Sequence, residues 1–171
     1  APVDITGTIN AGFISSIAVN PRNDDTVLVT VSNYGIIGVY WTGNANAASP
    51  TWTAVEGALT LPSYRSSAIA INGLTGVVEY YVGTSTGLWA SAGLPGAIAW
   101  AQEASGSIGN AVIFCLDHRP SDNQLLVGTH GYGMWSTFVP GCPTITVTNP
   151  VTATGTAGVA FSQTFTQTGA V

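Results

Sequence analysis

Short runs of apolar and β-branched residues, separated by polar or glycine-rich turns, recur along the chain up to about residue 139. Apolar runs of a few residues, or runs in which apolar and polar residues alternate, predict β-strands when turn residues bound them. No stretch combines a helical period with capping residues at its ends. The pattern therefore predicts an all-β protein.

Three segments repeat one order of elements, namely strand, polar turn, strand and glycine turn. These segments are 15–35, 66–87 and 112–133. A third short strand is predicted after each of them, at 38–43, 88–91 and 134–137. A fourth strand, which carries a tryptophan, follows in the first two units.

The tryptophans of the two predicted fourth strands, Trp52 and Trp100, are 48 residues apart. A four-stranded unit that recurs every 40 to 50 residues or so is typical of a β-propeller blade. The predicted fold is a partial β-propeller in residues 1–139, with about two full four-stranded blades and parts of flanking blades. The opening residues 1–13 would be the outer strand of a preceding blade.

The character of the sequence changes at Pro140. Residues 140–171 carry no charge, and Gly141, Pro143 and Pro150 indicate a linker before a new strand pattern. This part resembles the start of bacterial Ig-like modules, in which Phe161 and Phe165 would face inward. About 30 residues are too few for a sandwich of roughly 100, so we expect a truncated Ig-like β-sandwich.

Charged residues make up only 6% of the chain, and lysine is absent. Eight acidic residues against three arginines give a net charge of −5, which argues against a nucleic-acid partner. No apolar run approaches the roughly 20 residues of a membrane-spanning helix. A polar surface of Ser, Thr, Asn, Gln and Gly suits an extracellular or cell-surface location.

The motifs of the first and third units resemble those of the extracellular BNR or Asp-box β-propellers, found in sortilin-like, xyloglucanase-like and sialidase-like proteins. The resemblance is carried by "IAVNPRNDDTVLVTVSNYG" and "LDHRPSDNQLLVGTHGYGMW". It covers residues 1 to about 139. The acidic residue of a full Asp box is replaced in the turns "SNYG", "TSTG" and "THGYG".

An incomplete propeller exposes the edges of its outermost strands, whose backbone groups then lack partners. Propellers close with about four to eight blades. We therefore expect the remaining blades to come from the same longer chain or from other copies of the chain.

The glycine turns hold the candidate ligand-binding residues Tyr34, His130 and Tyr132. Tyr34 lies in "SNYG" and the other two lie in "THGYG". His130 could act as an acid, a base or a ligand, but no neighbouring residue completes a site, so a surface role is favoured. His118, in "LDHRPSDN", is predicted to lie in a turn and to be solvated.

The acidic residues do not form an obvious catalytic pair. Glycoside hydrolysis needs two carboxyl groups roughly 5 to 10 Å apart. Four of the acids are predicted in turns that connect strands: Asp24, Asp25, Asp117 and Asp122. Glu56, Glu79 and Glu103 are not paired by spacing either. No catalytic residue, metal ligand or cofactor is assigned, and no nucleophile elbow or phosphate loop is present.

Trp41, Trp89 and Trp135 follow the glycine turns at similar places in the three units. Flat rings can stack on sugars, but this recurrence favours packing between blades. The two cysteines, Cys115 and Cys142, permit one disulfide, although a buried Cys115 and a separate Cys142 explain the pair equally well.

The sequence favours a non-enzymatic propeller module that serves adhesion, matrix assembly or display and binds a protein or glycan partner. The alternative is a non-catalytic fragment of a carbohydrate-active propeller enzyme, either a glycoside hydrolase or a sialidase-like protein, with its catalytic carboxylates on other blades.

Overall fold

The computed structural model describes residues 2–9, 12–59, 63–140, 146–148 and 166–168, the last two stretches as backbone only. Within these residues the chain forms β-strands and no helix. The predicted all-β class is therefore confirmed.

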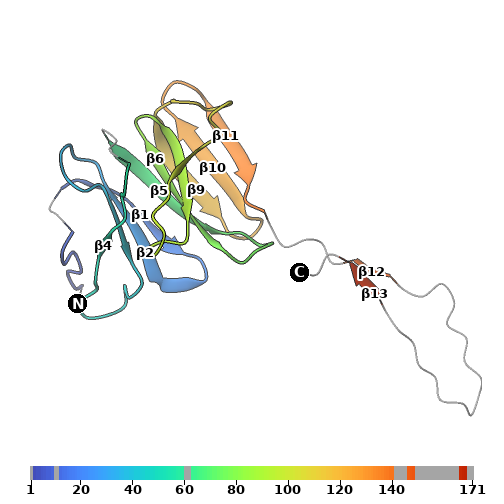
Figure 1. Cartoon of the computed structure of the whole chain (residues 1–171), viewed down its shortest axis with the longest axis horizontal. Helices are drawn as coiled ribbons and strands as arrows, with labels where there is room; N and C mark the ends of the chain where they lie inside the picture. The colour runs from blue at the N-terminus through green and yellow to red at the C-terminus, as the bar shows by residue number, and fades with distance from the viewer. Residues whose placement is uncertain (1, 10–11, 60–62, 141–145, 149–165, 169–171) are drawn as a thin grey trace, which may run out of the picture.

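Three antiparallel sheets follow one another along the chain (Figure 1). Sheet 1 contains β1 (Ile14–Asn20), β2 (Asn23–Val31), β3 (Val39–Thr42) and β4 (Thr53–Ala54). Sheet 2 contains β5 (Tyr64–Ile71), β6 (Val78–Thr84), β7 (Gly87–Ala92) and β8 (Ala101–Glu103). Sheet 3 contains β9 (Ile113–Arg119), β10 (Gln124–Thr129) and β11 (Met134–Phe138).

In each sheet the strands lie in chain order, so the predicted first, second and third strands of every unit are confirmed. The sheets are consistent with blades, but the described residues do not form a closed ring. Of the predicted Ig-like part, the structure describes only β12 (Thr146–Thr148) and β13 (Thr166–Thr168), which pair antiparallel. Phe161 and Phe165 lie outside the described residues.

The sheets stack face to face, with sheet 2 between the other two (Figure 1). One apolar cluster fills the space between sheets 1 and 2 and includes Leu28 and Val82. A second cluster fills the space between sheets 2 and 3 and includes Tyr81 and Val127. Because β5 packs against both neighbouring sheets, nearly all of its residues are buried, as expected for a covered inner strand.

The residue pairing within each sheet shows which positions of the three units correspond. Val29 of β2 pairs with Ile17, Val82 of β6 pairs with Ser67, and Val127 of β10 pairs with Leu116. Each of these three valines faces the preceding part of the chain. Ile17, Ser67 and Leu116 are therefore equivalent, and so are the residues before them, Ser16, Ser66 and Cys115.

A hydrogen bond that recurs between neighbouring first strands supports this equivalence. The Ser67 backbone N–H donates to Oγ of Ser16 at 3.1 Å. One sheet further on, the Leu116 backbone N–H donates to Oγ of Ser66 at 2.8 Å. β1 and β5 thus each offer a serine hydroxyl to a backbone amide of the next first strand, in addition to the apolar contacts.

The N-terminal segment, residues 2–9, does not form the predicted outer strand. It nevertheless has the same position relative to sheet 1 as the end of the first unit, around Val55 and Leu59, has relative to sheet 2. Trp52 donates its indole N–H to the Ile5 carbonyl at 2.8 Å, just as Trp100 donates to the Val55 carbonyl at 2.8 Å. Ile9 is buried against sheet 1, as Leu59 is buried between sheets 1 and 2.

The three tryptophans after the glycine turns pack between sheets, as predicted, but they are not all equivalent. Trp89 and Trp135 pair with Val82 and Val127, so both face the preceding sheet. Trp41 pairs with Leu28 and faces sheet 2, where its indole N–H donates to the Tyr80 hydroxyl at 3.2 Å. The prediction that the three tryptophans occupy similar places is therefore wrong for Trp41. Its neighbour Tyr40 pairs with Val29 and is the residue equivalent to Trp89, and adjacent strand residues point to opposite faces.

Candidate functional site

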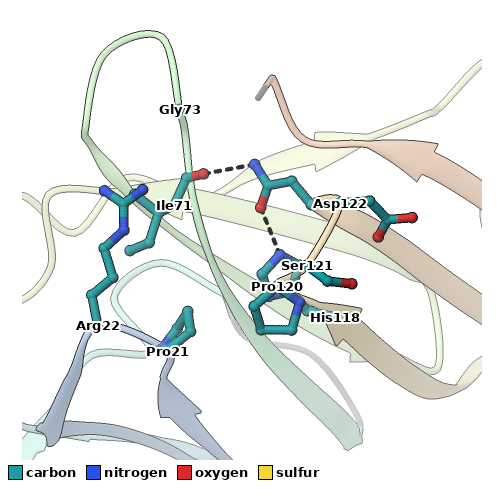
Figure 2. Close-up of a pocket in the computed structure, with 9 residues that line it drawn as sticks. Pro21, Arg22, Ile71, Gly73, His118, Pro120, Ser121 and Asp122 are labelled. Atoms are coloured by element: carbon teal, nitrogen blue, oxygen red, sulfur yellow. Dashed lines mark hydrogen bonds between the residues drawn. The ribbon is translucent and has the colours of Figure 1, made fainter. Parts of the chain in front are cut away.

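The turns between the first and second strands of all three sheets meet around one cavity, which we call the turn-end cavity (Figure 2). Its volume is about 520 Å³. Its lining comprises Pro21, Arg22, Ile71, Gly73, His118, Pro120, Ser121, Asp122 and Asn123. Residues about 50 positions apart in the sequence therefore face one space, because successive units place the same turn at the same end of the stack.

Asn123 fixes the geometry of this cavity. Its side-chain amide donates to the carbonyls of Ile71 at 2.8 Å and Val139 at 3.0 Å. Its Oδ1 lies 2.7 Å from Nε2 of His118 (Figure 2). The backbone of Asn123 has a φ of 59°, a left-handed conformation that asparagine tolerates better than most residues. One side chain thus ties the third sheet to the second and orients the imidazole.

Asp122 and Arg119 form an ion pair beside the cavity. Nε and Nη2 of Arg119 donate to the two carboxylate oxygens of Asp122 at 2.8 and 2.6 Å. The Arg119 guanidinium lowers the pKa of Asp122 from its ordinary value, and Asp122 in turn raises the pKa of Arg119. The charges of these two residues are therefore matched within the chain.

Arg22 differs from Arg119, because its guanidinium makes no hydrogen bond or ion pair with the described residues. The side chain extends from the β1–β2 turn and rises beside Ile71, across the cavity from His118 and Asp122 (Figure 2). The cavity thus combines an unpaired cation, an oriented imidazole and the Ser121 hydroxyl. These groups can hold the carboxylate and hydroxyl groups of a ligand.

The sequence-predicted candidates line neither this cavity nor the inter-sheet cavity described below. Tyr34 lies in the β2–β3 turn and is 78% exposed. His130 and Tyr132 are exposed in the β10–β11 turn, where the His130 backbone N–H donates to the Val112 carbonyl at 2.8 Å. The Tyr132 ring stacks on Trp135 with ring centroids 5.7 Å apart. The structure therefore keeps Tyr34 apart from the other two candidates, on a different sheet.

A second cavity, the inter-sheet cavity, lies between sheets 2 and 3 and has a volume of about 490 Å³. Glu79, Tyr81 and Glu103 all line it, although no spacing in the sequence pairs these acids. Oε1 of Glu79 accepts a hydrogen bond from Asn72 at 2.8 Å, and its Oε2 accepts one from the Tyr81 hydroxyl at 2.5 Å. Burial and the neighbouring Glu79 raise the pKa of Tyr81, so its hydroxyl stays protonated and donates.

Four of the residues predicted in turns lie in strands instead. Asp117 and His118 belong to β9, which continues to Arg119. Asp24 and Asp25 likewise belong to β2, where Oδ1 of Asp25 accepts the Asn46 backbone N–H at 3.0 Å. Asp122 lies between β9 and β10, as predicted. The strands are longer than expected because the cross-strand pairs continue close to the turns.

Cys115 is a free and exposed thiol, so the predicted alternative of a buried Cys115 is wrong, and the structure shows no disulfide at this residue. Cys142 lies outside the described residues. Among the residues that the structure describes, no group of three or more His, Cys, Asp or Glu side chains could hold a metal ion. Within the same residues, no helix is long and apolar enough to cross a membrane.

Comparison with known proteins found no family model and no curated protein that matches the chain. The structure supports an all-β protein whose antiparallel sheets are consistent with blades, and the comparison identifies no family.

Sequence reasoning missed the turn-end cavity, although a signal for it was present. "NPRN" and "HRPSDN" occupy equivalent turns of the first and third units, so any stacking of the units brings their polar residues to one end. The contribution of Ile71 and Gly73 could not be found in this way, because neither has a polar side chain that marks it as part of a site.

Proposed function

We propose that this chain is a non-enzymatic binding module of an extracellular or cell-surface propeller, which serves adhesion, assembly or display. One observation carries the proposal: three successive sheets contribute equivalent turns to the turn-end cavity, and its Arg22 guanidinium has no partner among the described residues. Loops at one end of a rigid β-scaffold are a common place for a binding site.

The chemistry of the cavity favours a ligand with a carboxylate group, on either an acidic glycan or an acidic protein segment. A guanidinium binds a carboxylate through two parallel hydrogen bonds, and it holds its charge at any physiological pH. The Ser121 hydroxyl and the His118 imidazole can add hydrogen bonds to neighbouring hydroxyl or amide groups. Asp122 does not repel the ligand strongly, because Arg119 pairs with it.

An array that carries neutral glycans, acidic glycans and acidic peptides tests this proposal with wild-type protein and the Arg22→Gln variant. We expect binding to an acidic ligand, and a loss of at least tenfold in Arg22→Gln, which corresponds to about 1.4 kcal/mol. Tyr34→Ala is the matched control, because Tyr34 is exposed but does not line the cavity. Equal binding by wild type and Arg22→Gln would contradict the proposal.

A carbohydrate-active enzyme is the second candidate, and the inter-sheet cavity is the observation that favours it, since Glu79 and Glu103 both line it. Both carboxylate oxygens of Glu79 already accept hydrogen bonds, which suits a structural role better than proton transfer to a substrate. A hydrolysis assay on the ligands that bind separates the candidates. Turnover that Glu79→Gln abolishes would support the enzyme, whereas binding without turnover supports the module.

A further inference from the structure

The outer face of sheet 3, which points away from sheet 2, corresponds to faces that are covered in the other two sheets. Leu28 and Tyr81 face the next sheet and are buried, with 0% and 8% of their surfaces exposed. Leu126 of β10 occupies the same position and is only half-buried. Met134 and Phe138 lie on the same face and are 77% and 64% exposed.

Cys115 marks the contact that this face lacks. It is equivalent to Ser16 and Ser66, whose hydroxyls accept a backbone N–H from the next first strand. At the other end of the stack, the residue whose backbone N–H would donate in such a contact is exposed. Ile17 of β1 is equivalent to Ser67 and Leu116, and it is 62% exposed, whereas Ser67 is 6% exposed.

Sheet 3 also lacks a fourth strand among the described residues. Counted from β11, this strand would fall near residues 147–149, where β12 is found, but β12 pairs with β13. The N-terminal segment is the complementary piece. Its Ile5 is equivalent to Val55, since Trp52 and Trp100 donate to their carbonyls in the same way. Val3 and Asp4 are therefore equivalent to the β4 residues Thr53 and Ala54.

We infer that two copies of the chain associate head to tail, with sheet 1 of each copy packed on the outer face of sheet 3 of the other. The N-terminal segment of each copy then supplies the fourth strand of the partner copy's sheet 3. The register follows from β4, which pairs Thr53 with Trp41 and Ala54 with Tyr40. Val3 of one copy would lie opposite Ser136 of the other, and Asp4 opposite Trp135.

A second copy is the occupant because the new contact repeats the two contacts already present within the chain. Sheet 2 packs on sheet 1 through the same contact by which sheet 3 packs on sheet 2. Sheet 1 of a second copy would pack on sheet 3 through this contact again. Two copies of the described stack of sheets 1 to 3 give six blade-like sheets, and propellers of about four to eight blades are known to close. A head-to-tail contact that closes gives a finite ring.

Asp117 is the weak point of this contact. It pairs with Leu126 and thus lies on the outer face of sheet 3, at the position of Ala18 and Ala68. Burial of a carboxylate against an apolar strand is unfavourable, so Asp117 limits the affinity. Asp117→Ala is expected to strengthen the association, an effect that general damage to the fold would not produce.

Sedimentation equilibrium of the full chain over a wide concentration range tests the association. The expected result is a transition from 17.4 kDa to twice that mass, which moves to at least fivefold lower concentration in Asp117→Ala. In Phe138→Asp the transition is expected to move to higher concentration. A mass of 17.4 kDa at every concentration for wild type and Asp117→Ala would overturn the inference, and so would growth beyond twice this mass.

Disulfide cross-linking tests the predicted register, because the Ser16 and Ser67 hydroxyls lie 3.0 Å apart in the equivalent contact. Ile17→Cys in a Cys142→Ser background places a thiol opposite Cys115 of the second copy. Oxidised glutathione is expected to join the two copies through these thiols. Leu74→Cys in the same background is the control, since Leu74 is exposed on a turn of the middle sheet. Equal cross-linking of both variants, or of neither, would overturn the inference.

The inference rests on the repeat of the fold and not on the binding role proposed above. The two are separable in one experiment, because Arg22→Gln changes ligand binding and leaves the outer face of sheet 3 intact. Loss of ligand binding with dimerisation retained would implicate only the turn-end cavity. Ligand binding by a strictly monomeric chain would overturn only the head-to-tail association.

Discussion

Ser66→Ala removes one of the two serine hydroxyls that accept a backbone N–H from the next first strand. Oγ of Ser66 accepts the Leu116 backbone N–H at 2.8 Å, and Ser66 is 6% exposed. In the variant, this N–H stays between sheets 2 and 3 without an acceptor. A buried donor without a partner costs about 1–3 kcal/mol. Leu116 is only half-buried, so we expect about 1–2 kcal/mol of lost stability.

For a domain of this length, 1 kcal/mol corresponds to about 2–4 °C, so the midpoint of thermal unfolding should fall by about 2–8 °C. Differential scanning calorimetry and urea denaturation measure the change. Ser49→Ala is the control, since Ser49 is exposed. Ser66→Cys should fall between wild type and Ser66→Ala, because sulfur is a weak acceptor. If Ser66→Ala and Ser49→Ala unfold at the same temperature, the bond between the sheets contributes nothing and the reasoning is refuted.

Two further predictions concern packing and charge. A Cβ on Gly38 would overlap the buried ring of Tyr64, so Gly38→Ala should cost about 1–3 kcal/mol in urea denaturation, whereas Gly106→Ala, with open space around it, should cost nothing measurable. Arg119 lowers the pKa of Asp122 below its ordinary 3.8, so their pair stabilises the fold above that pH and is lost as the pH falls through the folded-state pKa. Arg119→Gln should return the pKa of Asp122 toward 3.8 in an NMR titration, and an unchanged pKa would contradict the pairing.

The strands could be predicted from the sequence because each unit repeats local signals. "SSIAVN" and "SSAIAIN" contain the serine that joins the sheets and the apolar residues that fill the space between them. Asn20 at the end of β1, and Asn72 and Asn123 in the corresponding turns, then mark where the first two strands of each unit separate. These signals need no knowledge of distant contacts, so the order of elements and the all-β class followed from them.

The wrong or missed predictions concern the sheet face on which a side chain lies, or contacts between segments that are distant in the sequence. Trp41 looked equivalent to Trp89, yet a shift of one residue places its side chain on the opposite face of the sheet. Glu79 and Glu103 are distant in the sequence, and only the pairing of β6, β7 and β8 brings them to one cavity. The sequence around Arg22 does not indicate that its guanidinium lacks a partner among the described residues. Whether a charged side chain is paired depends on which residues the fold places next to it.

The central claim is that three equivalent first strands stack through the same contact, which is open at both ends of the stack among the described residues. Amide hydrogen exchange in a dilute solution tests it most directly. We predict slow exchange for the amides of Ser67 and Leu116, which donate to serine hydroxyls, and fast exchange for the equivalent amide of Ile17. Fast exchange at Ser67 and Leu116, or protection of all three amides at the lowest concentration, would contradict the account.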